Sequence, residues 1–426
     1  MTAATTAVFI LCYTLIALEQ PIRINRSAIA LIAAGLMWTL HSIASPLGIQ
    51  AVCDQLTDKL AETAAIVFFL IGAMTIVEVT DAHDGFSVIT SRIKATKVSS
   101  LLWVISIITF YLSAILDNMT TTIVMIALMK RLLKDHQQRL CFAGIIVIAA
   151  NAGGAWSPIG DITTTMLWIG GQVTTINIIK GVWLPSVVNI ALPLAVASMT
   201  LHGTVVPPDR IESGVGKTTP FERQLMFVMG MGALLFVPIF KAATHLPPYL
   251  AILFSLGVLW LSGNIVHRKK SAAAKEHLTL TKALKRIDMA SVIFFIGILL
   301  AVATLSANGT LPALAEWLDA RIGNQAIIVA LIGFVSAIVD NIPLVAAAIG
   351  MYPLAHFPAD SFLWEFLAYC AGTGGSLLII GSAAGVAAMG LERIEFFWFA
   401  RRIGPLALLG YLGGAATYLL QYALLH

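Results

Sequence analysis

Long apolar runs, separated by short polar and often basic segments, follow one another along almost the whole chain. A membrane-crossing helix needs roughly 20 apolar residues, and segments that only enter the membrane and return are shorter. Runs of spanning length predict helices near residues 4–19, 27–45, 62–80, 181–201, 224–240, 248–262, 289–305 and 404–424. Shorter runs predict two pairs of arms, 98–116 with 119–129 and 325–339 with 342–352, and an amphipathic stretch at 311–322. Glycine-rich segments interrupt the remaining runs, 140–170 and 362–391, and predict two broken helices.

The composition agrees with a membrane protein. Of the 426 residues, 58% are hydrophobic and only 11% are charged, whereas a soluble domain carries about 25% charged residues. The four cysteines lie far apart and form no CxxC pair, so they are interpreted as apolar packing residues. The sequence contains no nucleophile elbow, Walker loop, zinc signature or dinucleotide fingerprint. We therefore expect neither an enzyme nor a resident cofactor, and no nucleic-acid partner.

A short motif occurs twice in the chain. Residues 113–118, Ser-Ala-Ile-Leu-Asp-Asn, return 223 positions later as residues 336–341, Ser-Ala-Ile-Val-Asp-Asn. Two further landmarks repeat in the same order, namely 69–72 with 294–297, and the glycines 153, 154 and 160 with 374, 375 and 381. Matched landmarks across two halves of a transporter-like chain are typical of inverted repeats with a site at their interface.

The placement of Lys and Arg predicts the topology. Of the 26 such residues, 22 fall at one set of span ends, including Arg26 and the linker 264–287. The other side keeps only Lys59, Lys180, Lys241 and Arg321. By the positive-inside rule, the basic side is cytoplasmic and both termini face outwards. The sorting works only if both arms around Asp117 start and end on the basic side, and those around Asp340 on the other side. Both pairs are therefore predicted to be re-entrant hairpins of opposite orientation.

These patterns predict an all-α polytopic membrane protein with two inverted-topology repeats, re-entrant hairpins and discontinuous helices. The predicted divisions are N-terminal spans at 1–61, a first repeat at 62–203, connecting spans and a basic cytoplasmic linker at 204–287, and a second repeat at 288–426. The first repeat contains a hairpin at 98–130 and a broken helix at 140–170. The second contains a hairpin at 325–352, a broken helix at 362–391 and a last span at 404–424.

Candidate ligands gather at the hairpin tips and the helix breaks. An ionised carboxylate in hydrocarbon is costly, so Asp117, Asp161 and Asp340 are expected to face a cavity or a partner. Oxygen ligands suit hard cations, and no Lys, Arg or His lies within a tip or a break. The predicted ion-binding residues are Asp117, Asn118, Thr120, Thr121, Ser157, Asp161, Asp340, Asn341, Ser376 and Ser382. The glycines expected to unwind the helices and free backbone carbonyls are Gly153, Gly154, Gly160, Gly374, Gly375 and Gly381.

Proton exchange follows from the same carboxylates. Burial and mutual repulsion favour the protonated form of crowded carboxylates, so a proton and a metal cation compete for the same oxygens. Asp161 and Asp340 are the first candidates for the exchanging groups, and Asp117 is the third. The alternative for each aspartate is a structural role, in which it caps a helix N-terminus at a hairpin tip.

At these residues the sequence resembles the NhaD-type sodium/proton antiporters of the ion transporter superfamily. The resemblance covers nearly the whole chain and is carried by residues 113–121, 151–164 and 336–343. It implies a dimerising scaffold domain, a mobile transport domain with elevator-like movement, and extrusion of sodium and lithium in exchange for protons. Dicarboxylate relatives carry Ser-Asn-Thr at the hairpin tips, where this chain has Asp117 and Asp340. Arsenite permeases carry Asp-Asn-Pro hairpins, which Asp340-Asn341-Ile342-Pro343 approaches.

The sequence therefore predicts a sodium/proton antiporter of a bacterial inner membrane, acting in pH and sodium homeostasis, surrounded by lipid and assembled as a homodimer. The transport domain is expected at about 98–175 and 325–392. The main alternative is an arsenite or small-carboxylate permease on the same fold. A membrane-embedded hydrolase and a passive cation channel are further alternatives, and selectivity against potassium depends on cavity geometry that spacing does not give.

Overall fold

The computed structural model describes the chain except residues 1, 23, 47, 91–94, 96, 202, 204–217, 269, 271–277 and 426. The described residues form helices joined by short turns, and eight of these helices are long and apolar enough to cross a membrane. The chain is thus an all-α polytopic membrane protein, which confirms the fold class predicted from its hydropathy pattern.

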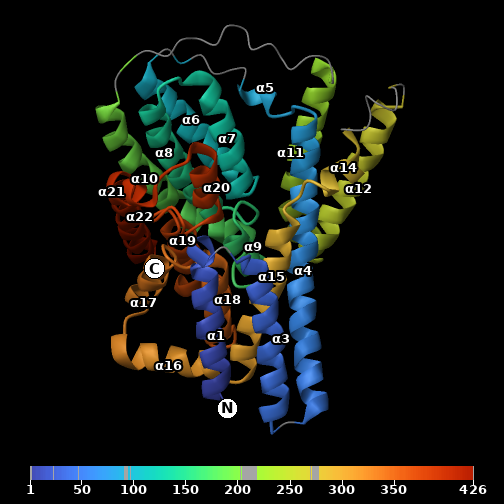
Figure 1. The fold of residues 1–426 in the computed structure, drawn as a ribbon, viewed down its shortest axis with the longest axis vertical. Coiled ribbons are helices and arrows are strands. Elements are labelled where there is room, and N and C mark those ends of the chain that lie inside the picture. Colours follow the sequence, from blue (N-terminus) through green and yellow to red (C-terminus); the bar gives the residue numbers. More distant parts are fainter. Residues whose placement is uncertain are drawn as a thin grey trace.

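One group of helices contains the packed pair α3 and α15, and α4, which also contacts α11 and α12 (Figure 1). Its members are α1 (Thr2–Ala17), α2 (Glu19–Ile22), α3 (Arg26–Ala44), α4 (Ile49–Ala82), α5 (Ser87–Thr90), α11 (Pro220–Thr244), α12 (Pro248–Val266), α14 (Leu280–Leu284), α15 (Met289–Ala307) and α16 (Thr310–Ile322). Helix α3 packs along α15, and α4 packs against both α12 and α15. In Figure 1, α4 runs through almost the full height of the molecule, whereas α1 and α3 occupy its lower half. The α2–α3 junction therefore lies at mid-height.

The second group contains the hairpins and the broken helices. Its members are α6 (Val98–Ser113), α7 (Asn118–Leu132), α8 (His136–Ala155), α9 (Ile162–Ile169), α10 (Thr175–Thr200), α17 (Gln325–Val335), α18 (Asn341–Met351), α19 (Phe362–Gly374), α20 (Ala383–Glu392), α21 (Phe396–Arg402) and α22 (Gly404–Leu425). The hairpin α6–α7 lies at the upper end of Figure 1, and α17–α18 lies lower, above the transverse helix α16. The two hairpins therefore point towards one another, as opposite orientations require.

Contacts at matched positions support the predicted repeat. The Ser113 hydroxyl donates to the Ala150 carbonyl at 2.6 Å, and the Ser336 hydroxyl donates to the Ala371 carbonyl at 3.1 Å. In both halves a hairpin arm packs so closely on the first part of a broken helix that a glycine is required. A Cβ at Gly153 meets the Phe110 carbonyl oxygen, and one at Gly374 meets that of Gly333.

Two boundaries differ from the sequence prediction. Helix α4 begins at Ile49, so a single helix crosses the predicted division between residues 61 and 62. The apolar run from 62 continues upstream as a helix with an exposed polar face, including Asp54 and Asp58, which a search for spanning apolar runs does not detect. Helix α8 also continues through Gly153 and Gly154 and ends at Ala155. These two glycines permit close packing and do not unwind the helix.

Some predictions fall on residues that the structure does not describe. They include Arg92 and Lys94 in the basic stretch before α6, Arg210 and Lys217 before α11, and Lys275 in the linker.

Candidate ion-binding site

Each hairpin tip and each helix break ends in a polar residue that caps the next helix. Asp117 and Asp340 are the N-caps of α7 and α18, and Asp161 and Ser382 are the N-caps of α9 and α20. These are matched positions in the two halves. Four helix N-termini, with the partial positive charge of their free N–H groups, are thereby directed to one region. The capping role foreseen as an alternative for the aspartates is present in the structure.

Capping leaves part of each carboxylate available for other contacts. Asp161 is 2% exposed and accepts from the Thr163 backbone N–H at 2.9 Å and the Thr163 hydroxyl at 2.7 Å, both at Oδ1. Its Oδ2 accepts from the Asn118 amide at 2.8 Å. Asp117 accepts from the Thr120 N–H at 2.8 Å through Oδ1 and from the Thr120 hydroxyl at 2.5 Å through Oδ2. The threonines that follow each aspartate thus fix the orientation of its carboxylate.

A buried amide network joins the two repeats. Asn151, which is fully buried in α8, accepts from the Asn118 amide at 3.0 Å. Its own amide donates to the hydroxyls of Ser376 and Ser382, both at 2.9 Å, at the break between α19 and α20. Asn151 therefore connects the first hairpin tip with the second helix break. The sequence prediction included both serines but omitted Asn151, although an Asn inside an apolar helix was an available signal.

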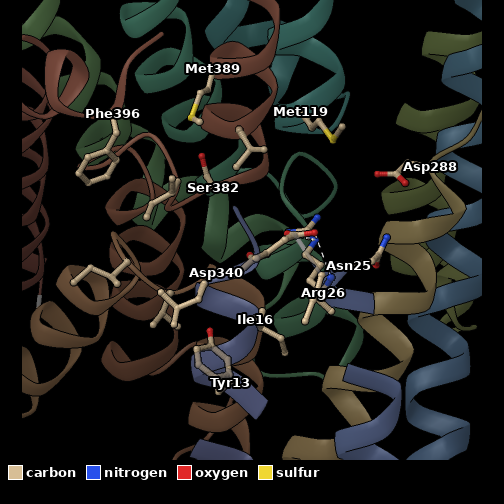
Figure 2. A pocket seen from close by; sticks show the side chains of 17 residues that line it. Tyr13, Ile16, Asn25, Arg26, Met119, Asp288, Asp340, Ser382, Met389 and Phe396 are labelled. Carbon is tan, nitrogen blue, oxygen red and sulfur yellow. Dashed lines mark hydrogen bonds and ion pairs between the residues drawn. The ribbon is translucent and has the colours of Figure 1, made fainter. Parts of the chain in front are cut away.

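A small cavity of about 60 Å³ lies between the hairpin tips. It is lined by Asp117, Asn118, Asp161, Asp340 and Asn341, together with apolar side chains of α4 and α15. A larger cavity of about 850 Å³ adjoins it, with Tyr13, Asn25, Met119, Ser382 and Phe396 in its wall (Figure 2). Five predicted residues thus share one small cavity.

The remaining predicted residues lie around the cavity without entering it. The Ser157 hydroxyl donates to the Ala114 carbonyl and fastens the first break to the first hairpin. Thr120 donates to Asp117, the N-cap of α7, and the Thr121 hydroxyl is buried with no hydrogen-bond partner among the described residues. Gly160 and Gly381 each pack against the hairpin backbone of their own half, at the Ser113 and Ala337 carbonyls respectively.

Arg26 is the residue that the sequence analysis misplaced. It was assigned to a cytoplasmic flank, but its Nη1 lies 3.4 Å from Oδ2 of Asp340. The physical reason is that α3 begins at mid-height of the molecule, so this basic residue at the start of an apolar run lies beside the second hairpin tip (Figure 1). The hairpin tips and helix breaks contain no Lys, Arg or His, as the sequence shows. The positively charged side chain beside Asp340 is that of Arg26, which belongs to α3.

Negative charge nevertheless predominates around the small cavity. Its wall includes four carboxylates, those of Asp117, Asp161, Asp288 and Asp340, and the single guanidinium of Arg26. The carboxylates do not converge on one point. Within the described ranges, no three His, Cys, Asp or Glu side chains are placed to hold a metal ion together. A cation here would be bound by a mixture of carboxylate, amide and hydroxyl oxygens.

Helices broken at membrane depth, with polar caps gathered around a cavity between two halves, define a secondary transporter. The citrate transporter family model matches residues 13–372. Among similar proteins, sodium/proton antiporter 2 of Arabidopsis thaliana is 46% identical over 96% of both chains, and sodium/proton antiporter 1 of the same plant is 49% identical over 98% of this chain and 72% of its own length. The Na+/H+ antiporter NhaD of Vibrio cholerae is 31% identical over 98% of this chain and 91% of its own length. The chain belongs to the NhaD-type sodium/proton antiporter family.

Proposed function

We propose that this protein exports sodium, and also lithium, in exchange for protons. The observation that carries the proposal is the buried Asp161 carboxylate, which lines the small cavity opposite the Asp117 and Asp340 tips. A carboxylate at this depth is stable when a proton or a cation neutralises it and costly when it is bare. The names of the related antiporters agree with this assignment.

The exchange follows from competition at shared oxygens. Thr163 holds one oxygen of Asp161, and the Asn118 amide contacts the other. Asp117 is held in the same manner by Thr120. In this scheme a proton and a sodium ion displace one another from Asp161, with Asp340 as the second exchanging carboxylate and Asp117 and Asn118 as ligands. Binding of one ion then requires release of the other.

An alternative is transport of a small carboxylate, which the description of the matching family model suggests. The charges of the cavity oppose it, because four carboxylates against one guanidinium repel an anion. Moreover, the guanidinium is already paired with Asp340. Sodium is therefore the favoured substrate.

The remaining assignments complete the proposal. The protein acts in a bacterial inner membrane as a homodimer, with both termini outside, and supports pH and sodium homeostasis. The group containing α6–α9 and α17–α20 moves relative to the α3–α4–α15 group, in an elevator-like manner. The two hairpin tips would travel together, because the Asn151 network joins their halves.

Reconstitution tests the proposal directly. Purified protein is placed in liposomes that contain a pH-sensitive dye, and sodium, lithium, potassium or citrate is added outside. Because sodium or lithium added outside enters in exchange for luminal protons, the proposal expects the lumen to become more alkaline. It expects no response to potassium citrate beyond that to potassium chloride. A response to citrate without sodium or lithium would favour the carboxylate permease. Sodium flux without proton movement would favour a channel.

A further inference from the structure

Arg26 is the first residue of α3, and it contacts α15 as well as Asp340 of the second hairpin. Its Nη2 donates to the Ser291 hydroxyl at 3.3 Å, and its guanidinium carbon lies 4.7 Å from the centre of the Phe294 ring. The next residue, Ser27, donates its hydroxyl to the Ala290 carbonyl at 2.7 Å. Two contacts to α15 therefore hold the guanidinium independently of Asp340, and the Ser27 contact fixes the adjoining start of α3 on α15.

The ion pair also lies where the two cavities meet. Arg26, Asp288 and Asp340 line both the small cavity between the tips and the larger cavity of about 850 Å³. Figure 2 shows Arg26 and Asp340 facing one another, with Asp288 nearby. The side chains of Arg26 and Asp340 are 25% and 16% exposed, so the pair is partly shielded from water.

The two halves differ at this point. Asp340 pairs with Arg26, whereas the ion pairs of the described residues include neither Asp117 nor Asp161. The matched carboxylate, Asp117, accepts from the Thr120 N–H and hydroxyl. A repeated site therefore carries a permanent positive charge on one side only.

We propose that Arg26 competes with the transported cation for the Asp340 carboxylate. The guanidinium pairs with Asp340 when no metal ion is bound and must be displaced when a metal ion enters. A guanidinium does not lose its proton in proteins, so this competitor is present at every pH. The competition weakens cation binding, because the Arg26–Asp340 ion pair must break before the metal ion can bind Asp340. It also prevents a bare Asp340 carboxylate in the empty transporter, which would be costly at this depth.

This inference rests on the proposed sodium site and predicts the opposite of a simple loss of function. Replacing Arg26 by Gln removes the competitor, so the protein should bind sodium more tightly. We expect a decrease in the sodium dissociation constant of about fivefold, which corresponds to roughly 1 kcal/mol for a partly exposed ion pair. Because tighter binding slows release, the maximal transport rate should fall in the same variant. Arg26→Lys keeps the charge and should stay near the wild-type affinity.

The experiment is titration calorimetry with sodium chloride on the purified full-length protein in detergent at pH 9, where protons compete least. It compares wild type with Arg26→Gln, Arg26→Met and Arg26→Lys, and transport by each is measured in liposomes. Tighter sodium binding in both neutral variants, with near wild-type binding in Arg26→Lys, supports the proposal. Two neutral variants allow the test to proceed if one of them fails to fold.

Unchanged or weaker sodium binding in a folded neutral variant overturns the role of Arg26, while wild-type sodium binding and transport leave the proposed function intact. A purely structural Arg26 would lower the stability of the neutral variants without tightening sodium binding. A wild-type protein that neither binds nor transports sodium would instead reject the proposed function, and this inference with it.

Discussion

The Asn118 amide, at the tip of the first hairpin, donates to the Asp161 carboxylate at the first helix break, over 2.8 Å. Both residues are more than nine-tenths buried. A hydrogen bond to a buried carboxylate is stronger than one between neutral groups and is costly to leave unmade. The same amide also donates to Asn151, so the orientation of the proposed exchanging group depends on contacts that extend into the second repeat.

The first prediction concerns the Asn151 network. Asn151→Ala removes an acceptor for Asn118 and a donor for Ser376 and Ser382. Each buried group left unsatisfied costs roughly 1–3 kcal/mol, so the melting temperature in detergent should fall by several degrees. Asn177, whose amide contacts Asp360 in an exposed position, provides the control. Asn177→Ala should change the melting temperature little, and an equal effect of the two variants would contradict a special role for Asn151.

The second prediction concerns the close contacts that repeat in the two halves. Gly153→Ala and Gly374→Ala place a Cβ against the carbonyl oxygens of Phe110 and Gly333. Neither backbone can move without opening a hairpin arm, so each variant should lose about 1–3 kcal/mol of stability. Gly257 in α12 has open space at the Cβ position, and Gly257→Ala should be neutral or stabilising. Thermal unfolding followed by intrinsic fluorescence measures all three variants. Two tolerated substitutions at Gly153 and Gly374 would contradict the packing described for the hairpins.

A third prediction tests the proposed topology. Cys53 is exposed near the start of α4, whereas Cys12 and Cys370 are buried and Cys141 is partly buried. If both termini face outwards, the α3–α4 turn does so as well, because α1 runs inwards from the N-terminus and α3 runs back outwards. A membrane-impermeant thiol reagent should therefore label Cys53 in intact cells, and Cys53→Ser should abolish that labelling. Labelling that appears only in everted vesicles would reverse the proposed orientation.

The fourth prediction is a pH dependence of stability at the C-terminal end of α4. His83 follows the last residue of α4 and stacks on His267, with the ring centres 4.9 Å apart. The Nε2 atoms of the two rings share a hydrogen bond of 3.2 Å. Burial lowers the pKa of His83 below its ordinary value of 6.5, although Val79 and Glu222 oppose the shift. The unfolded chain therefore takes up a proton first as the pH falls.

The folded state should accordingly lose stability below about pH 6.5, and little change from His83 is expected above that pH. His83→Gln cannot take up this proton. The difference in melting temperature between pH 7.5 and pH 5.5 should thus be smaller in His83→Gln than in wild type. A larger difference in the variant would show that His83 does not have this effect.

The hydropathy pattern predicted most of the fold because spanning helices must satisfy their backbone within themselves, so their length and apolar character appear directly in the sequence. The repeated Asp-Asn motif likewise indicated Asp117 and Asp340 as hairpin tips. The start of α4 was missed because its first turns are helical yet polar on one face. The matched pairs of glycines were mostly correct in location, but spacing does not distinguish a glycine that packs closely from one that unwinds a helix.

The site was harder to predict where it depends on the height at which a helix begins in the fold, or on contacts between segments far apart in the sequence. Arg26 looked like a topology signal because it precedes an apolar run, and only the position of the α2–α3 junction at mid-height brings it to Asp340. Asn151 was within the recognised break segment, yet its partners Ser376 and Ser382 are more than 220 residues away in the sequence. No local pattern records such a contact.

The most direct test of the account is sodium-driven proton movement in everted membrane vesicles, for wild type, Asp161→Asn and the exposed control Asp54→Asn. Asp54 lies on the polar face of α4 and accepts from the Gln50 amide. The account predicts that sodium reverses the quenching of a pH dye in wild type and Asp54→Asn but not in Asp161→Asn, at equal protein levels. Sodium-driven dequenching that persists in Asp161→Asn, or that is absent from well-expressed wild type across pH 6.5–9, would contradict the central claim that protons and sodium compete for the Asp161 carboxylate.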